Sequence, residues 1–134
     1  MKSFLTVLSL FTALIITSCN DDNDNDTICT DEFVIITVSI TDQNQNPVTL
    51  DSFKVLNTEN GHEITIPLSL SELTAAQELG QYPLIQDGIL GVNQRQKIQF
   101  KGFLDNQEVV SSDYTVGTDC CHVGVISGNL ELIL

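Results

Sequence analysis

The chain has 134 residues, 42% of them hydrophobic, and its 18 acidic residues against five basic ones give a formal net charge of −13. This length predicts a single domain. The charge argues against nucleic acid as a partner, because phosphate backbones are bound by clusters of Lys and Arg. It also argues against a protein that lies flat on anionic lipid, whereas basic partners or divalent cations are compatible with it.

The first 18 residues are typical of a secretory signal peptide. Lys2 supplies a positive start, an apolar run follows from Phe4 to Ile16, and the small residues Thr17 and Ser18 precede Cys19. A signal peptide needs a charged start, a short apolar core and a small residue before the cut. The run is about 13 residues, shorter than the roughly 20 that a spanning helix needs.

Ile16-Thr17-Ser18-Cys19 resembles the lipobox of bacterial lipoproteins. The resemblance implies cleavage before Cys19, acylation of its thiol, and durable membrane anchoring by more than one acyl chain. The segment 19–30 is then a lipidated cysteine with an acidic tether, and residues 31–134 form the domain. Loss of Lys2 with the first 18 residues takes the net charge from −13 to −14.

The tether contains the run Asn20 to Asp26, which has no apolar side chain and is expected to stay solvated. Such a run after the lipidated cysteine resembles the signal that sends Bacteroidota lipoproteins to the outer face of the outer membrane. We therefore expect a lipid-anchored protein of the outer membrane, exposed at the cell surface.

The same run partly matches a calcium-binding loop. Its positions 1, 3, 5 and 12 would be Asp21, Asn23, Asn25 and Glu32. The sixth position of such a loop requires glycine for its turn, and here it is Asp26. We therefore expect no calcium site, with these four residues as the candidates if calcium does bind.

From Asp31 onward the pattern predicts strand after strand. Alternating β-branched residues in Phe33 to Ile40 are typical of a half-buried strand. Phe53, Val55 and Asn57 share a face in the second predicted strand, and Ile64 to Leu68 forms the third. One helix is expected from Ser71, as its cap, to Leu79, ending at Gly80.

The second half of the chain continues with short strands. They are predicted over Tyr82 to Gln86, where Pro83 favours a sheet edge, around Ile98 and Phe100, around Val109 to Val116, and in a final hairpin. That hairpin pairs Val123 and Val125 with Leu130, Leu132 and Leu134 through Ser127-Gly128-Asn129. Together the spacing indicates an all-β, antiparallel sandwich of about seven to eight strands.

The run from Val38 to Val48, with its Asp42 turn and Asn46-Pro47-Val48, resembles the opening of carboxypeptidase-regulatory-like and related immunoglobulin-like domains. Gly80-Gln81-Tyr82 resembles their later Gly-x-Tyr strand. With Asp119-Cys120-Cys121-His122 and the Ser127-Gly128-Asn129 turn, the chain is similar to short Bacteroidota surface lipoproteins. The resemblance implies an immunoglobulin-like fold and transfers no catalytic residue.

Three cysteines remain besides Cys19, in a compartment where disulfides form. Cys29 precedes the first strand and the pair Cys120-Cys121 precedes a late one. We favour a Cys29–Cys121 bond, because Cys121 shares strand parity with Val123, and keep Cys29–Cys120 as the alternative. The favoured bond leaves Cys120 free.

Neither zinc nor catalysis is predicted. Cys120, Cys121 and His122, with His62 elsewhere, lack zinc spacing, and consecutive strand residues point to opposite faces. No nucleophile–base pair is apparent, and no cofactor is expected. The sequence predicts a non-catalytic binding or structural module, held by its lipid and meeting other envelope proteins. The alternatives are a calcium- or zinc-binding lipoprotein and, behind it, a small hydrolase.

Overall fold

The computed structural model describes residues 28–134. The predicted signal peptide, the predicted lipidation site Cys19 and the three tether residues considered for calcium lie outside this range. Within it, strands and one helix follow one another in the order β1 (Ile35–Thr41), β2 (Ser52–Asn57), α1 (Leu70–Leu79), β3 (Gln81–Gln86), β4 (Arg95–Leu104), β5 (Gln107–Thr118), β6 (Val123–Ser127) and β7 (Glu131–Ile133).

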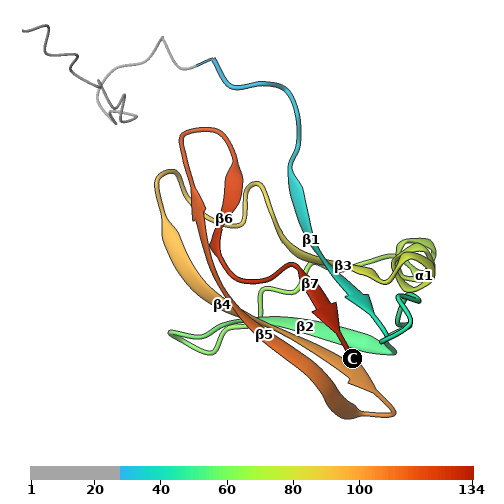
Figure 1. The fold of residues 1–134 in the computed structure, drawn as a ribbon. Coiled ribbons are helices and arrows are strands. Elements are labelled where there is room, and N and C mark those ends of the chain that lie inside the picture. Colours follow the sequence, from blue (N-terminus) through green and yellow to red (C-terminus); the bar gives the residue numbers. More distant parts are fainter. Residues whose placement is uncertain (1–27) are drawn as a thin grey trace, which may run out of the picture.

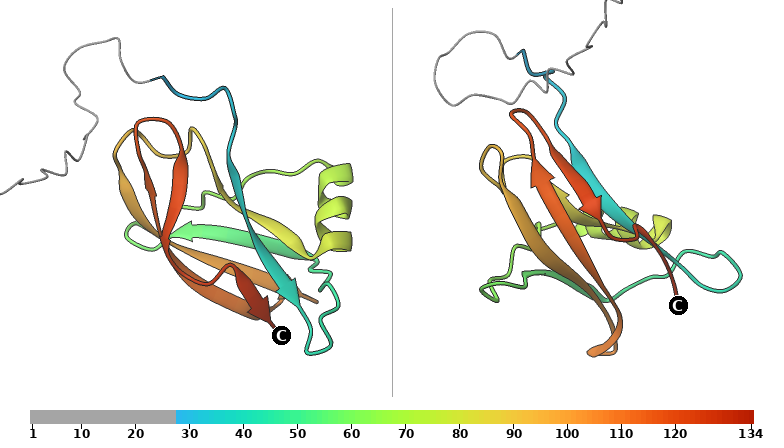
Figure 2. Two further views of the ribbon diagram at one scale, coloured as in Figure 1. Left: turned by 45° about the horizontal axis from the view of Figure 1, so that its top comes forward. Right: turned by 60° about the vertical axis from the view of Figure 1, so that its left-hand side comes forward.

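The strands form two sheets, as the sequence predicts for a sandwich (Figure 1). One sheet has the order β3-β1-β7 and the other the order β2-β4-β5-β6. All neighbours are antiparallel except β1 and β7, which run parallel. The helix α1 lies beside β3, away from the β4–β5 hairpin (Figure 2).

The core lies between the two sheets and is built by alternation along the strands. In β4, Ile98 and Phe100 are fully buried, whereas Arg95, Lys97 and Gln99 point outward on the other face. The predicted alternation of β1 is confirmed, since Val38 and Ile40 are also fully buried. Burying such side chains supplies most of the stabilisation of a domain.

Tyr82 on β3 links the core to the segment that leads into β2. Its ring packs against Phe53 and Phe100, with centroids 5.6 and 6.4 Å away. Its hydroxyl donates to the carbonyl oxygen of Val48 and accepts from the N–H of Leu50, both at 2.7 Å. Burial raises the pKa of Tyr82, so the phenol stays protonated and can donate.

The helix begins earlier than the sequence prediction placed it. Its cap is Ser69, not Ser71, because Ser69 and Glu72 form a capping box in which each side chain bonds the other's backbone N–H. Its end is as predicted, since Gly80 adopts a left-handed conformation with φ of 64°. The Ser69 hydroxyl also donates to the Glu72 carboxylate at 2.6 Å, and this bond, with that from the Ser69 backbone N–H, lowers the pKa of Glu72.

The predicted third strand, from Ile64 to Leu68, is wrong. Only an isolated bridge joins this part of the chain to β2, between Leu56 and Glu63. The backbone N–H of Val55 donates to the side-chain oxygen of Thr65 at 2.9 Å, not to a backbone carbonyl. A side chain that takes a ladder hydrogen bond ends the strand pairing there.

The predicted final hairpin is also wrong. β6 pairs with β5, whereas β7 crosses to the other sheet and pairs with β1. Gly128, with φ of 125°, makes the crossing, and a Cβ there would lie 2.3 Å from the ring of Tyr114. The Tyr114 hydroxyl donates to the carbonyl oxygen of Asn129 at 2.6 Å and fixes the path to β7.

Pro83 lies on β3, which is an edge strand of its sheet, as expected. It pairs with Thr37, next to a register shift between β1 and β3.

Among residues 28–134, no helix combines the length and the apolar character that crossing a bilayer requires.

Candidate functional site

A disulfide joins the segment before β1 to the turn before β6. It links Cys29 to Cys121, whose Cα atoms are 5.3 Å apart across 92 positions of sequence. The favoured pairing is therefore confirmed. The expectation that Cys120 stays free is wrong, because no cysteine of the described residues is a free thiol. The bond places the end of the predicted tether against the four-stranded sheet.

Beside this disulfide, three side chains form a hydrogen-bonded chain. His122 follows Cys121, and its Nδ1 lies 2.8 Å from Oδ2 of Asp87, directly after β3. On the other side of the imidazole, Nε2 lies 3.0 Å from Oγ1 of Thr30, one residue after Cys29. His122 was a candidate from the sequence, whereas Thr30 and Asp87 were not, because only the fold brings these distant positions together.

Asp87 is the centre of this arrangement. Besides the His122 contact, its carboxylate accepts the backbone N–H of Val34 at 2.9 Å and that of Val123 at 2.7 Å. The hydrogen bond from His122, followed by that from Val34, lowers the pKa of Asp87. The carboxylate thus joins three segments: the approach to β1, the end of β3 and the start of β6.

Asp119 shapes the turn that carries Cys121 and His122. Its Oδ1 accepts the backbone N–H groups of Cys121 and His122 at 2.7 and 2.8 Å, and its own N–H donates to the carbonyl oxygen of His122. These hydrogen bonds lower the pKa of Asp119. An Asp in this role mimics a backbone turn, so the disulfide and the imidazole are held in fixed positions. We call Cys29, Thr30, Asp87, Asp119, Cys121 and His122 the junction cluster.

The order hydroxyl, imidazole, carboxylate in Thr30, His122 and Asp87 is that of a hydrolytic triad. Acyl transfer also needs free N–H donors aimed at a developing oxyanion. The nearby N–H groups of Val34, Val123, Cys121 and His122 all donate to Asp87 or Asp119. These four N–H groups are therefore not free to bind an oxyanion, and their hydrogen bonds fasten neighbouring segments of the chain together.

A metal site at the cysteine turn is disfavoured for a similar reason. Asp119, Cys120 and Cys121 place candidate ligand atoms within 4.8 Å of one another. Zinc binds thiolates, and the sulfur of Cys121 is committed to Cys29. Of the other candidates, Glu32 is exposed, and His62 lies in the turn after β2 and joins no such group among residues 28–134.

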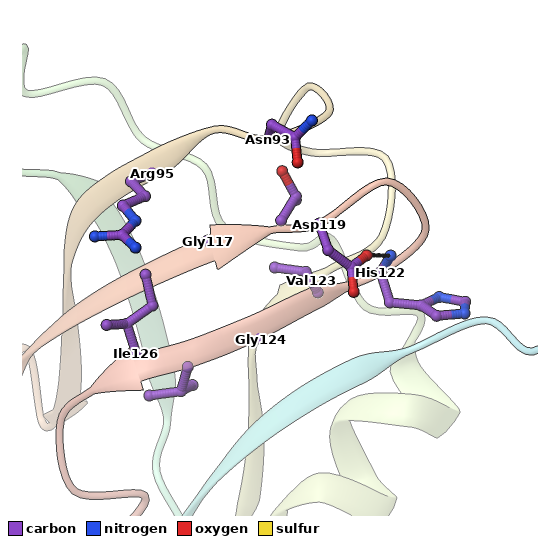
Figure 3. Close-up of a pocket in the computed structure, with 10 residues that line it drawn as sticks. Asn93, Arg95, Gly117, Asp119, His122, Val123, Gly124 and Ile126 are labelled. Atoms are coloured by element: carbon purple, nitrogen blue, oxygen red, sulfur yellow. Dashed lines mark hydrogen bonds between the residues drawn. The ribbon is translucent and has the colours of Figure 1, made fainter. Parts of the chain in front are cut away.

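Behind the junction cluster, the outer face of the four-stranded sheet is hollowed. A depression of about 480 Å³ is lined by Arg95, Gly117, Gly124, Ile126 and the cluster's Asp119 and His122, among others. Figure 3 shows the imidazole of His122 turned away from it toward β1, and Arg95 extending toward Ile126. The hollow and the hydrogen-bonded chain are thus separate features on two sides of the same turn.

Comparisons with protein-family models, with curated proteins and with solved structures returned no match.

Proposed function

We propose that the chain is a membrane-anchored, surface-exposed lipoprotein whose β-sandwich is a non-catalytic binding or structural module. The lipid is carried by Cys19 and the acidic tether connects it to the domain. Ten peptide steps separate Cys19 from Cys29, so at about 3.5 Å per residue the tether spans at most ~35 Å. The domain is then held close to the membrane surface.

The observation that supports this proposal best is the cross-link at the tether's end. By chain order the tether enters β1, in the three-stranded sheet. Through the Cys29–Cys121 bond it is also joined directly to the four-stranded sheet, two residues before β6. A pull on the tether is therefore shared by both sheets and does not peel β1 away from its neighbours. This is the arrangement that an anchored display domain needs.

The rest of the junction cluster supports the same role. Thr30 and the approach to β1 are hydrogen-bonded to His122 and Asp87 as well as being cross-linked. The committed N–H donors around the imidazole support a non-catalytic role. Envelope proteins or extracellular polymers are the partners that such a position makes accessible.

Lipid labelling tests the anchor. Cells expressing the protein should incorporate labelled palmitate into it, and the Cys19→Ala variant should lose the label and leave an uncleaved or soluble product. Cys29→Ala serves as the matched control, since it removes a cysteine without touching the lipobox, and should keep the label. Equal labelling of Cys19→Ala and the wild type would contradict the proposal.

Exposure at the surface is tested separately. Protease added to intact cells should degrade the domain, while a periplasmic marker protein stays intact. Degradation only after the outer membrane is opened would place the domain on the inner side and overturn the surface assignment.

A further inference from the structure

The cationic side chains of the domain gather on one surface. The described residues contain four, Lys54 on β2 and Arg95, Lys97 and Lys101 on β4. They alternate with core residues of the two strands, and Lys54 lies directly opposite Lys101 in the register. All four therefore point outward from the four-stranded sheet, in a domain whose charge is otherwise strongly negative.

These four cations divide into two pairs. Lys101 binds Glu108 at 2.8 Å and Lys54 lies 3.8 Å from Glu63. Arg95 and Lys97 have no carboxylate oxygen within 4.0 Å in the described part of the chain. Two uncompensated cations thus lie two residues apart on one face of β4, with Cα atoms about 7 Å apart.

Each of these two cations lines a hollow. Arg95 borders the depression described above, and Lys97 borders a second one of about 440 Å³. Arg95 and Lys97 are neighbours on the same face of β4, so the two hollows follow one another along the strand. We call these two neighbouring hollows on the outer face of the sheet, taken together, the cationic trough.

The floor of the trough contains two glycines, and the backbone is open at one of them, Gly124. On β5, Gly117 lies opposite Arg95 of β4 on one side and opposite Gly124 of β6 on the other. A Cβ at Gly117 would come within 2.8 Å of Ile126, whereas at Gly124 nothing lies within 4 Å. Figure 3 shows Arg95 and Ile126 flanking this stretch of backbone. A ligand can therefore approach the backbone closely at Gly124, whereas the Ile126 side chain covers Gly117.

The rim beside Arg95 is held in place. Thr118 donates its hydroxyl to the carbonyl oxygen of Gly91 and accepts the N–H of Gln94 at 3.0 Å. Its own N–H donates to the carbonyl oxygen of Gln94 at 2.9 Å. The loop that leads into β4 is thus fixed on β5, and little ordering is needed when a ligand binds.

Part of the remaining lining is polar and supplies hydrogen-bonding groups. Hydroxyls come from Thr115 and Ser127, and an amide from Gln99. The carboxylates of Asp113 and Asp119 already accept hydrogen bonds, from Gln99 and from the turn backbone, and keep further lone pairs for donors. A ligand that suits this surface carries anionic groups for the two cations and many hydroxyls for the rest.

We propose that the cationic trough binds a carboxylated polysaccharide, with Arg95 and Lys97 holding its carboxylates. The guanidinium of Arg95 can bind a carboxylate through two parallel hydrogen bonds. Both hollows are open to solvent and follow one another along β4, so together they suit a polymer. Recognition is by charge and hydrogen bonds, since the aromatic rings of the lining are those of Tyr114, which is buried, and His122, which is turned toward β1. The proposal specifies the ligand of the proposed binding module and rests on that function.

The test measures binding of the whole chain, in neutral detergent, to polygalacturonate, with dextran as an uncharged polysaccharide and poly-glutamate as an acidic peptide. Polygalacturonate should bind, and its affinity should fall as salt rises, because exposed charges are screened. Arg95→Gln and Lys97→Gln should each weaken binding about tenfold or more. The matched controls Lys54→Gln and Lys101→Gln remove the same charge from the same face, where each is already paired, and should change the affinity less than threefold.

A variant that places a side chain in the trough tests the place of binding without removing a charge. Gly124→Leu should abolish binding of polygalacturonate while leaving the melting temperature nearly unchanged, because its side chain enters open space. Equal loss in all four charge variants would show only a general charge effect and overturn the assignment to the trough. Equal or tighter binding of poly-glutamate, or of dextran, would overturn the ligand class, and no polygalacturonate binding would overturn the proposal. Lipid labelling of Cys19 is independent of these results, so failure of the anchor and failure of the trough are distinguishable.

Discussion

Removing the Cys29–Cys121 bond should destabilise the domain strongly, even though the two cysteines bury little side-chain surface. Cys29 is exposed and Cys121 is only partly buried, so the double variant Cys29→Ser, Cys121→Ser loses little packing. The main consequence lies in the unfolded chain. Without the bond, the unfolded chain regains the freedom of a closed loop that spans 92 positions.

The magnitude follows from loop-closure entropy. For a loop of this length the chain-entropy relation gives about 16 cal/mol/K, or ~4.6 kcal/mol at 25 °C. Unfolding entropies of about 2.1 cal/mol/K per residue convert this to a fall of roughly 20 °C in the melting temperature of a domain of this size. This is a large part of the 5–15 kcal/mol that is typical of total stability.

Urea unfolding of wild type and double variant, followed by circular dichroism without reductant, measures the loss. A second double variant with Ala at both positions controls for the polarity of Ser and should show the same loss. A loss below about 1 kcal/mol in both would refute the reasoning, because it would mean that the bond does not restrict the unfolded chain. Fragmentation mapping that links Cys29 to Cys120 would refute the assignment itself.

Three further predictions test the packing and the junction cluster. Tyr82→Phe leaves buried polar groups of residues 48–50 without their partner and should cost about 1–3 kcal/mol in urea unfolding; no loss would mean that water or a shift of that segment replaces the hydroxyl. Gly80→Ala should cost clearly more than Gly61→Ala, because both have positive φ but only at Gly80 would the Cβ meet backbone, at 2.6 Å; equal melting temperatures would contradict this. The pKa of Asp87 is lowered in the folded protein, so its stabilising contribution is full above the ordinary aspartate pKa of about 3.9 and is lost as pH falls through the lower folded value. Wild type should therefore lose more stability on acidification than Asp87→Asn. Parallel pH profiles of the two proteins would argue against the carboxylate's role.

The alternation of apolar residues predicted most of the strands and the core because a strand with one buried face must alternate. Val38 and Ile40, or Ile98 and Phe100, are placed by this rule alone. This rule does not predict which strands belong to which of the two sheets. β7 looks like the second arm of a hairpin with β6, and only the packing of Gly128 against Tyr114 shows why it crosses to β1.

Side-chain hydrogen bonds explain the other differences. The Ile64 to Leu68 stretch has the composition of a strand, yet the Thr65 hydroxyl takes the N–H that pairing requires. The helix cap was predicted two residues late, although the Ser-x-x-Glu pattern of Ser69 and Glu72 is visible in the sequence.

The candidate site was predictable in part. The Cys29–Cys121 bond was predictable, because an oxidising compartment and the strand parity of Cys121 can each be inferred from a few residues of the sequence. The partners of His122, Thr30 and Asp87, are 92 and 35 positions away, and no local pattern marks them. The cationic trough likewise depends on the register of β4, β5 and β6, which places two glycines beside Arg95.

The mass of the N-terminal peptide of the protein purified from membranes is the sharpest test of the lipid anchor. If Cys19 carries lipid, the peptide begins at Cys19 and carries acyl chains, with a thioether on the Cys19 sulfur that leaves no thiol to form a disulfide. A peptide that begins at Met1, or a Cys19 sulfur found in a disulfide, would contradict the anchored-module account.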